Sequence, residues 1–330
     1  MGFSISILNS IRANASNEYQ ARIPEATRTN IAEIGNALQT YDVQFNEFSS
    51  ALIHKIGKTL IESKLFKNRL AKYKSGEIMS EQDVEEIFVT EPKAAGAYNP
   101  AGPNPLGRRA TPQDKVVYHR LNRQDVYELS LGDLDFLRVF RTESSLDTYI
   151  TAKINGIYSA AAKDEWQLMK NLLATYDGYF EYEVPAMDGT NNAEAAKTFV
   201  KTLRKAVSDL TVGYSNQYNK AGVETWNKPE DLVLIVHKDV IAEVDVEVLA
   251  KAYNLGKTDI QVAVEVLDDF GSMVDCYAIL VDKAWFRVYD TLSRMAQQYN
   301  AQGLFTNYFY HVHQIISCSP FKNAVKFKKV

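Results

Sequence analysis

The 330-residue chain has few of the residues on which disulfide frameworks, metal centres and membrane spans depend. Its two cysteines, Cys276 and Cys318, lie far apart and in no spacing typical of a metal site. They predict free, buried thiols in a reducing compartment. No run approaches the roughly 18 apolar residues that cross a membrane, and no signal peptide opens the sequence, so we expect no membrane partner.

The chain also lacks an excess of positive charge. Its 37 Lys and Arg residues against 41 Asp and Glu residues give a net charge of −4. This balance argues against a dedicated nucleic-acid-binding module, for which a basic domain is expected, although one face can still contact nucleic acid. The 19 Tyr and 15 Phe residues are typical of a protein with large buried interfaces.

Motifs for catalysis and cofactor binding are missing as well. Two Gly-Lys-Thr motifs, at 57–59 and 256–258, resemble the end of a phosphate-binding loop, but neither has the leading glycine that shapes the loop. His311 and His313 share one face of a predicted strand, but a zinc site needs further ligands. We therefore predict no catalytic, cofactor-binding or metal-binding residues.

Two long amphipathic helices are present. In the first, apolar residues recur in steps of three and four and continue to Leu60: Ile31, Ile34, Leu38, Tyr41, Phe45, Phe48 and Leu52. This pattern fits a helix packed on its own core and, less well, a coiled coil. The second helix begins at a capping box, Ser144 with Asp147, and continues to Tyr176, which gives a rod of roughly 50 Å.

A proline-rich tract separates the two helices. Five of the nine prolines lie between Pro92 and Pro112, where they exclude a helix or a central strand. The β-prone runs 87–90 and 116–118 flank this tract and predict two strands joined by a long irregular tip. Charges of opposite sign on the strand and the tip indicate contacts with a neighbouring copy of the chain, and they fit a solvated loop equally well. The candidate contact residues are Glu85, Glu86, Glu91, Lys93, Arg108 and Arg109.

The remainder alternates strand and helix patterns, which predicts an α+β fold with one mixed domain around residues 231–300. We expect strands at 126–131, 232–236, 262–267, 277–281 and 308–328. We expect helices at 193–210, 246–253 and 285–295, and a turn-rich connector at 181–192.

This order of elements resembles the major capsid (head) proteins of tailed bacteriophages, which have the Hong Kong 97-type fold, and is most similar to those of small phages of Gram-positive hosts. The segments that carry the resemblance are 68–73 leading into 84–89, 118–127, 134–140 and 149–173. They are similar in order and texture rather than in an invariant motif.

The resemblance implies an α+β capsid fold with an N-terminal arm, an extended β-hairpin loop, a long spine helix and a mixed α/β axial domain. The domains it implies are an N-terminal arm and helix (1–74), the extended hairpin loop (75–120), the peripheral domain with the spine helix (121–180), the axial domain with its connectors (181–307), and C-terminal strands that return to the peripheral domain (308–330).

The resemblance also implies a function. The chain would be a major capsid protein, not an enzyme, that self-assembles as hexamers and pentamers into an icosahedral or prolate head shell around phage double-stranded DNA, which it would bind without sequence specificity. A scaffolding protein and a portal would be its other partners. It would assemble in the host cytoplasm and reside in the virion. The alternatives are an encapsulin-like compartment shell, a coiled-coil scaffold protein and a cytoplasmic enzyme that uses the mixed domain.

Overall fold

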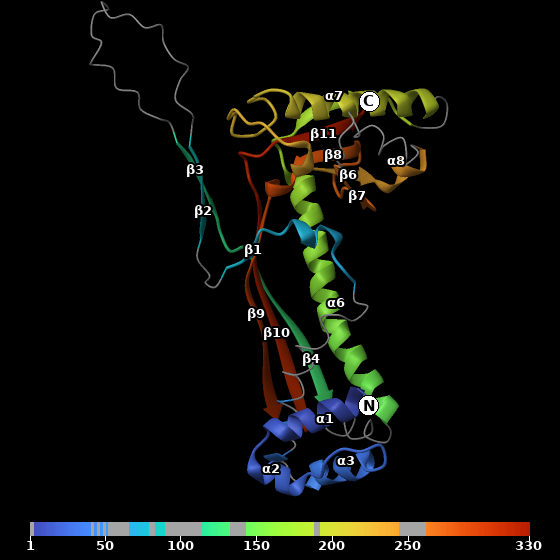
Figure 1. The fold of residues 1–330 in the computed structure, drawn as a ribbon, viewed down its shortest axis with the longest axis vertical. Coiled ribbons are helices and arrows are strands. Elements are labelled where there is room, and N and C mark those ends of the chain that lie inside the picture. The colour runs from blue at the N-terminus through green and yellow to red at the C-terminus, as the bar shows by residue number, and fades with distance from the viewer. Residues whose placement is uncertain are drawn as a thin grey trace, which may run out of the picture. The chain divides into compact units, whose positions relative to one another are not determined.

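The computed structural model describes residues 3–40, 43–44, 47–48, 51, 66–78, 83–89, 114–132, 143–187, 192–243 and 262–330. The chain forms two compact units (Figure 1). The first unit contains residues 1–68, 123–166 and 292–313, and the second contains 69–122, 167–291 and 314–330. Helix α6 (Glu143–Thr175) and strands β9 (Phe286–Asn300) and β10 (Phe305–Cys318) each belong partly to both units.

The first unit has a helical core formed by α1 (Phe3–Asn14), α2 (Asn17–Arg22) and α3 (Ile31–Thr40). Ser16 caps α2, where its hydroxyl accepts a hydrogen bond from the Tyr19 amide. The predicted start of the first long helix at Ile31 is confirmed by α3, and Ile31, Ile34 and Leu38 of its apolar face are buried in one cluster with Phe48. The helix therefore packs on its own core, which favours that alternative over a coiled coil.

Helices α1 and α2 lie in the first thirty residues, where the resemblance implied only an N-terminal arm. Ile5, Leu8 and Ile11 of α1 are buried against α3 residues in the same core. Tyr41, Phe45 and Leu52, and residues 53–60 of the predicted first helix, lie outside the described residues.

The second long helix is confirmed as α6, a 33-residue helix that rises about 50 Å at 1.5 Å per residue. In the first unit, the buried Glu165 carboxylate accepts a hydrogen bond of 2.7 Å from Asn68. In the second unit, Lys170 is 2.9 Å from Asp268 and 3.0 Å from Asp269. Burial alone would lower the pKa of Lys170, but the hydrogen bonds to these two carboxylates outweigh burial and raise it. Within the described part of the chain, no helix combines the length and the apolar character needed to cross a membrane.

The second unit is built around a five-stranded sheet with the order β5-β11-β8-β6-β7. Its strands are β5 (Phe180–Val184), β6 (Leu232–His237), β7 (Ala263–Leu267), β8 (Cys276–Asp282) and β11 (Ala324–Lys329). The first five residues of β6 are fully buried, which explains why this strand is a continuous apolar run. Helix α7 (Asn192–Thr211) packs its apolar face on the sheet (Figure 1).

A second sheet has the order β1-β9-β10-β4, with β1 (Gly76–Glu77) and β4 (Arg123–Gly132) at its edges. A short 3₁₀ helix, η2 (Arg69–Tyr73), precedes β1. Gly76 has a φ of +132°, a conformation that favours glycine, where the chain turns into its parallel pairing with β9. The C-terminal segment 308–330 thus supplies β10 to this sheet and β11 to the five-stranded sheet.

The predicted hairpin is confirmed. Strands β2 (Val84–Phe88) and β3 (Lys115–His119) pair antiparallel, with Val84 opposite His119 and Phe88 opposite Lys115. The tract that joins them lies outside the described residues. The other predicted strands are also confirmed in place: 126–131 as β4, 232–236 as β6, 262–267 as β7, 277–281 as β8, and 308–328 as β10 with β11. The predicted helix at 193–210 is confirmed as α7.

Two predictions are wrong. The predicted helix at 285–295 is strand β9, preceded by the 3₁₀ turn η4 (Lys283–Trp285). Apolar residues there recur at spacings that fit either structure, and pairing with β1 and β10 selects the strand. The predicted connector at 181–192 begins instead with β5, which pairs parallel to β11 from the far end of the chain. The predicted helix at 246–253 lies outside the described residues, which include a short helix α8 (Lys238–Glu243) just before it.

Candidate assembly site at the β2–β3 hairpin

The hairpin belongs to the second unit, and it has one exposed apolar face and one face turned towards the rest of that unit. Because side chains alternate along a strand, Ile87, Val89, Val116 and Tyr118 share the exposed face. They are 54%, 67%, 44% and 55% exposed, respectively. The register places Ile87 opposite Val116 and Glu85 opposite Tyr118, whose hydroxyl donates a 3.0 Å hydrogen bond to Glu85. An isolated two-stranded hairpin is at best marginally stable, so contacts on its other face must hold it.

The inward face contains a polar network that we call the hairpin root network: Glu86, His119, Arg287, Ser317 and Ser319. Glu86 Oε2 is 3.0 Å from His119 Nε2, and Glu86 Oε1 accepts hydrogen bonds from Ser319 Oγ at 2.9 Å and Arg287 Nε at 3.2 Å. His119 Nδ1 is 2.8 Å from Ser317 Oγ. The network therefore joins both hairpin strands to β9 and to the end of β10.

Electrostatics explains why a carboxylate is tolerated there. Burial alone would raise the pKa of Glu86, but the hydrogen bonds from His119, Arg287 and Ser319 and the Arg287 charge lower it to about 2. Burial would likewise lower the pKa of Arg287, and its pairing with Glu86 raises it. Each charged group thus compensates the cost of burying the other.

Further contacts hold the hairpin and the segment that follows it. The rings of Phe88 and Phe321 lie 5.6 Å apart, and Lys115 Nζ donates to the Ala221 carbonyl oxygen. Asn122 Nδ2 donates to the Ile316 carbonyl oxygen at 2.8 Å, and its Oδ1 accepts from the Ile316 amide at 2.8 Å. The exposed apolar face makes no comparable contact among the described residues, so it is the face available to another molecule.

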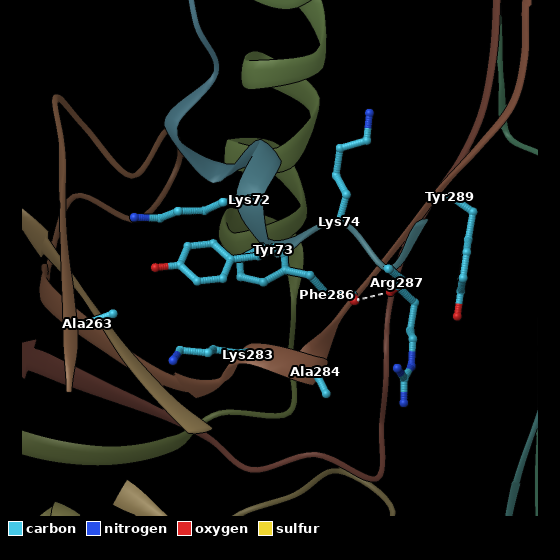
Figure 2. Close-up of a pocket in the computed structure, with 10 residues that line it drawn as sticks. Lys72, Tyr73, Lys74, Ala263, Lys283, Ala284, Phe286, Arg287 and Tyr289 are labelled. Carbon is cyan, nitrogen blue, oxygen red and sulfur yellow. Dashed lines mark hydrogen bonds between the residues drawn. The ribbon is translucent and has the colours of Figure 1, made fainter. Parts of the chain in front are cut away.

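An open hollow of about 570 Å³ lies beside β1 in the same unit (Figure 2). Figure 2 shows Lys72, Lys74, Lys283 and Arg287 around it, a basic lining that could hold an anion. However, Lys72 pairs with Glu265, Lys74 with Asp290 and Arg287 with Glu86, and Lys283 donates to the Glu230 carbonyl oxygen. Most of this positive charge is already compensated inside the chain, so the hollow offers a ligand little net charge.

The described residues contain no group of three or more His, Cys, Asp and Glu side chains that could hold a metal ion. His311 and His313 lie half-buried on β10. The two cysteines are free, and burial raises the pKa of Cys276 and of Cys318 to about 12. Both thiols are therefore protonated at neutral pH and poorly reactive.

The structure places two of the six predicted contact residues. Glu85 is on the exposed face of β2, and Glu86 is on the inward face, where its carboxylate bonds within the chain. Glu91, Lys93, Arg108 and Arg109 lie outside the described residues. Sequence reasoning missed His119, Arg287 and Ser319, although the alternation in β2 already puts Glu86 on the same face as Val84 and Phe88.

Three structural features together define the class of protein: a long spine helix, a mixed sheet domain and a hairpin with one exposed face. The capsid protein of Staphylococcus phage Andhra has a similar fold, with a TM-score of 0.66, 12% sequence identity, and coverage of 82% of this chain and 86% of that one. The fold is thus the Hong Kong 97-type fold of phage capsid proteins.

The family model for the Phi29-like phage major capsid protein matches residues 8–328. The major capsid protein of Bacillus phage B103 is 34% identical over 328 residues, which cover 98% of this chain and 72% of that protein. The major capsid protein of Streptococcus phage Cp-1 is 28% identical over 346 residues, with coverage of 97% and 93%. The chain belongs to the Phi29-like phage major capsid protein family, and it is a structural protein of the phage head.

This identification confirms the predicted fold class and the predicted function as a major capsid protein, including its similarity to phages of Gram-positive hosts. The comparisons lend no support to the compartment, coiled-coil and enzyme alternatives. Capsid proteins of this kind self-assemble into shells and form part of the virion, so the surfaces of interest are those that meet other copies of the chain.

Proposed function

We propose that this chain assembles as pentamers and hexamers into a closed head shell that encloses double-stranded DNA, and that it acts only as a structural subunit, not as an enzyme. Assembly takes place in the host cytoplasm with a scaffolding protein and a portal. The extended loop of residues 75–120 lies on an adjacent copy, and the predicted division into arm, loop, peripheral domain and axial domain describes the parts of this subunit.

The exposed apolar face of the β2–β3 hairpin carries the proposal. On a two-stranded ribbon, the exposure of four neighbouring apolar side chains to water does not stabilise the isolated subunit: Ile87, Val89, Val116 and Tyr118. The opposite face is held by the buried hairpin root network, so the hairpin is presented in a defined orientation. In a shell, many copies offer the same contact at once, and a modest contact area per copy is enough.

Charged residues add specificity to this contact. Glu85 lies at the edge of the apolar face, and Glu91, Lys93, Arg108 and Arg109 follow it in the loop sequence. Opposite charges on one loop favour a single seating on an identical neighbour and disfavour others. Glu86 supports the contact indirectly, since its carboxylate holds the hairpin from within.

The test is co-expression of the full chain with the scaffolding protein of the same phage, followed by negative-stain electron microscopy and light scattering. Wild-type chain is expected to form closed shells. The double variant Ile87→Ser/Val116→Ser is expected to remain folded but to form no closed shells, because both side chains are already solvent-exposed in the subunit. The deletion of residues 91–111 is expected to do the same.

Val274→Ser is the matched control, since it removes an exposed valine (96%) from a turn of the same unit. It is expected to leave shell formation intact. Closed shells of normal size from the hairpin double variant, or from the loop deletion, would contradict the role given to the hairpin.

A further inference from the structure

Helix α7 sorts its side chains into an apolar face and a basic face. Phe199, Leu203, Ala206 and Leu210 are at most 1% exposed and belong to the core of the second unit. The residues exposed between Glu194 and Ser208 lie on the opposite side of the helix, and four of them form what we call the α7 basic stripe: Lys197, Lys201, Arg204 and Lys205.

The stripe is compact and rigidly mounted. Its residues recur in steps of four, three and one, so they share one side of the helix and extend over about 12 Å at 1.5 Å per residue. The apolar face beneath them packs on Val184 of β5 and Phe327 of β11, which fixes the helix on the five-stranded sheet. The cations are thus presented by a well-packed element, not by a loop.

The charge of the stripe is not compensated within the described part of the chain. Among the described residues, no carboxylate forms an ion pair with any of these four side chains. Lys205 makes a cation–π contact instead, with its Nζ 5.7 Å from the centroid of the Tyr182 ring. Among the described residues of α7, Glu194 is the one exposed acid, at the N-terminal end of the stripe, and the partly buried Asp209 accepts a hydrogen bond of 2.7 Å from the Tyr182 hydroxyl. In a chain with a net charge of −4, this is a local concentration of positive charge that folding does not use.

We propose that the α7 basic stripe contacts the phosphate backbone of double-stranded DNA inside the shell. This inference rests on the proposed enclosure of DNA and names the surface that meets it. Duplex DNA carries one negative charge per about 1.7 Å, so a face of about 12 Å lies opposite several phosphates. Backbone contacts hold DNA without reading its sequence, as a container for a whole genome requires.

The composition of the stripe favours duplex DNA over other polyanions. Its exposed side chains include no aromatic ring, and stacking platforms for single-stranded nucleic acid depend on such rings. They include no large apolar side chain either, whereas the cores of protein–protein interfaces are enriched in aromatic residues and depleted in lysine. An acidic protein partner is therefore the less favoured occupant.

The test measures binding of the full chain to a fluorescent duplex of about 20 base pairs by anisotropy, across salt concentrations of about 50 to 200 mM. The stripe variant replaces all four residues by glutamine: Lys197→Gln, Lys201→Gln, Arg204→Gln and Lys205→Gln. The matched control removes three lysines and one arginine from exposed sites elsewhere: Lys67→Gln, Lys163→Gln, Lys238→Gln and Arg294→Gln.

Each phosphate contact contributes about 0.9 to the slope of log K against log salt concentration. The stripe variant is expected to lose about 3 to 4 from this slope and at least roughly tenfold in affinity at the lowest salt, for duplexes of any sequence. The control is expected to keep the wild-type slope to within about one. Lys201→Gln alone, which changes one exposed side chain, is expected to lose about 0.9.

Equal slopes for wild type and the stripe variant, or no binding by wild type, would overturn the proposal. So would a stripe variant that keeps its affinity for the duplex but no longer retains the co-expressed scaffolding protein, since the stripe would then be a protein-docking surface. Electron microscopy of the same samples separates this proposal from the shell proposal, which fails only if wild-type chain does not form closed shells.

Discussion

At the scale of single residues, Glu86 is the side chain on which the hairpin depends most. Its carboxylate receives hydrogen bonds from Ser319 and Arg287 and lies against His119, and its side chain is only 14% exposed. Arg287 is itself largely buried, at 20% exposure of its side chain. Removing one charge of such a pair leaves the other without compensation.

Glu86→Gln is therefore expected to lower the free energy of unfolding by about 3 kcal/mol, as loss of one partner of a buried pair does. Urea unfolding of the full chain measures this change. Glu85→Gln, on the exposed face of the same strand, is the control and is expected to change stability by less than about 0.5 kcal/mol. Equal effects of the two substitutions would refute the structural role of the network.

The depressed pKa of Glu86 gives a pH dependence with a definite sign. Its pKa falls from the ordinary value of 4.5 to about 2 on folding, so the folded state favours the ionised form. The stabilisation is complete above the unfolded-state pKa and is lost as the pH falls towards 2. The stability difference between wild type and Glu86→Gln should shrink steadily between pH 5 and about pH 2. A difference that stays constant over this range would show that Glu86 is not held ionised.

At the scale of elements, the hairpin has two faces with separate tasks. Phe88 points inward, and its ring lies 5.6 Å from that of Phe321. Ile87, which directly precedes it in β2, points to the exposed face and is 54% exposed. One face thus holds the hairpin on its own subunit, and the other is free for a neighbour.

Phe88→Ala is expected to cost about 1 to 3 kcal/mol of stability, less than a fully buried Phe because the site is only half-buried. Ile87→Ala is expected to cost less than about 0.5 kcal/mol but to impair shell assembly. Thermal unfolding of the unassembled chain and electron microscopy of assembly mixtures measure the two effects. The reverse pattern, a destabilising Ile87→Ala with normal shells, would show that the faces have been assigned the wrong way round.

At the scale of the whole molecule, folding and assembly depend on different residues. The core of the second unit is formed by fully buried strand residues such as Leu234 and Leu280, far from the exposed face of the hairpin in sequence. Variants in the core should therefore act on the stability of each subunit, and variants on exposed faces should act on the shell.

Leu280→Ala is expected to lose about 2 to 5 kcal/mol by creating a cavity. At low temperature it should still close shells, and these shells should disrupt at a lower temperature than wild-type shells in a heating series followed by light scattering. A failure to form shells at low temperature, with a subunit that is folded by circular dichroism, would mean that the core also determines assembly.

The sequence by itself determined the elements that have strong local patterns. Helix α6 follows from its three-four spacing, the hairpin from two β-prone runs around a proline tract, and β6 and β8 from short apolar runs. Each of these signals lies within the element that it describes, so no knowledge of distant residues is needed. The order of these elements was also enough to indicate the capsid family.

Only the tertiary structure decided the features that depend on distant partners. β9 is a strand because β1 and β10 pair with it, and β5 is a strand because β11 pairs with it. Glu86 meets Arg287 across 201 positions and Ser319 across 233, a separation over which no local pattern carries information. Local propensity is weak wherever helix and strand are both acceptable, and the hydrogen-bonding partner that the fold brings alongside then determines the outcome.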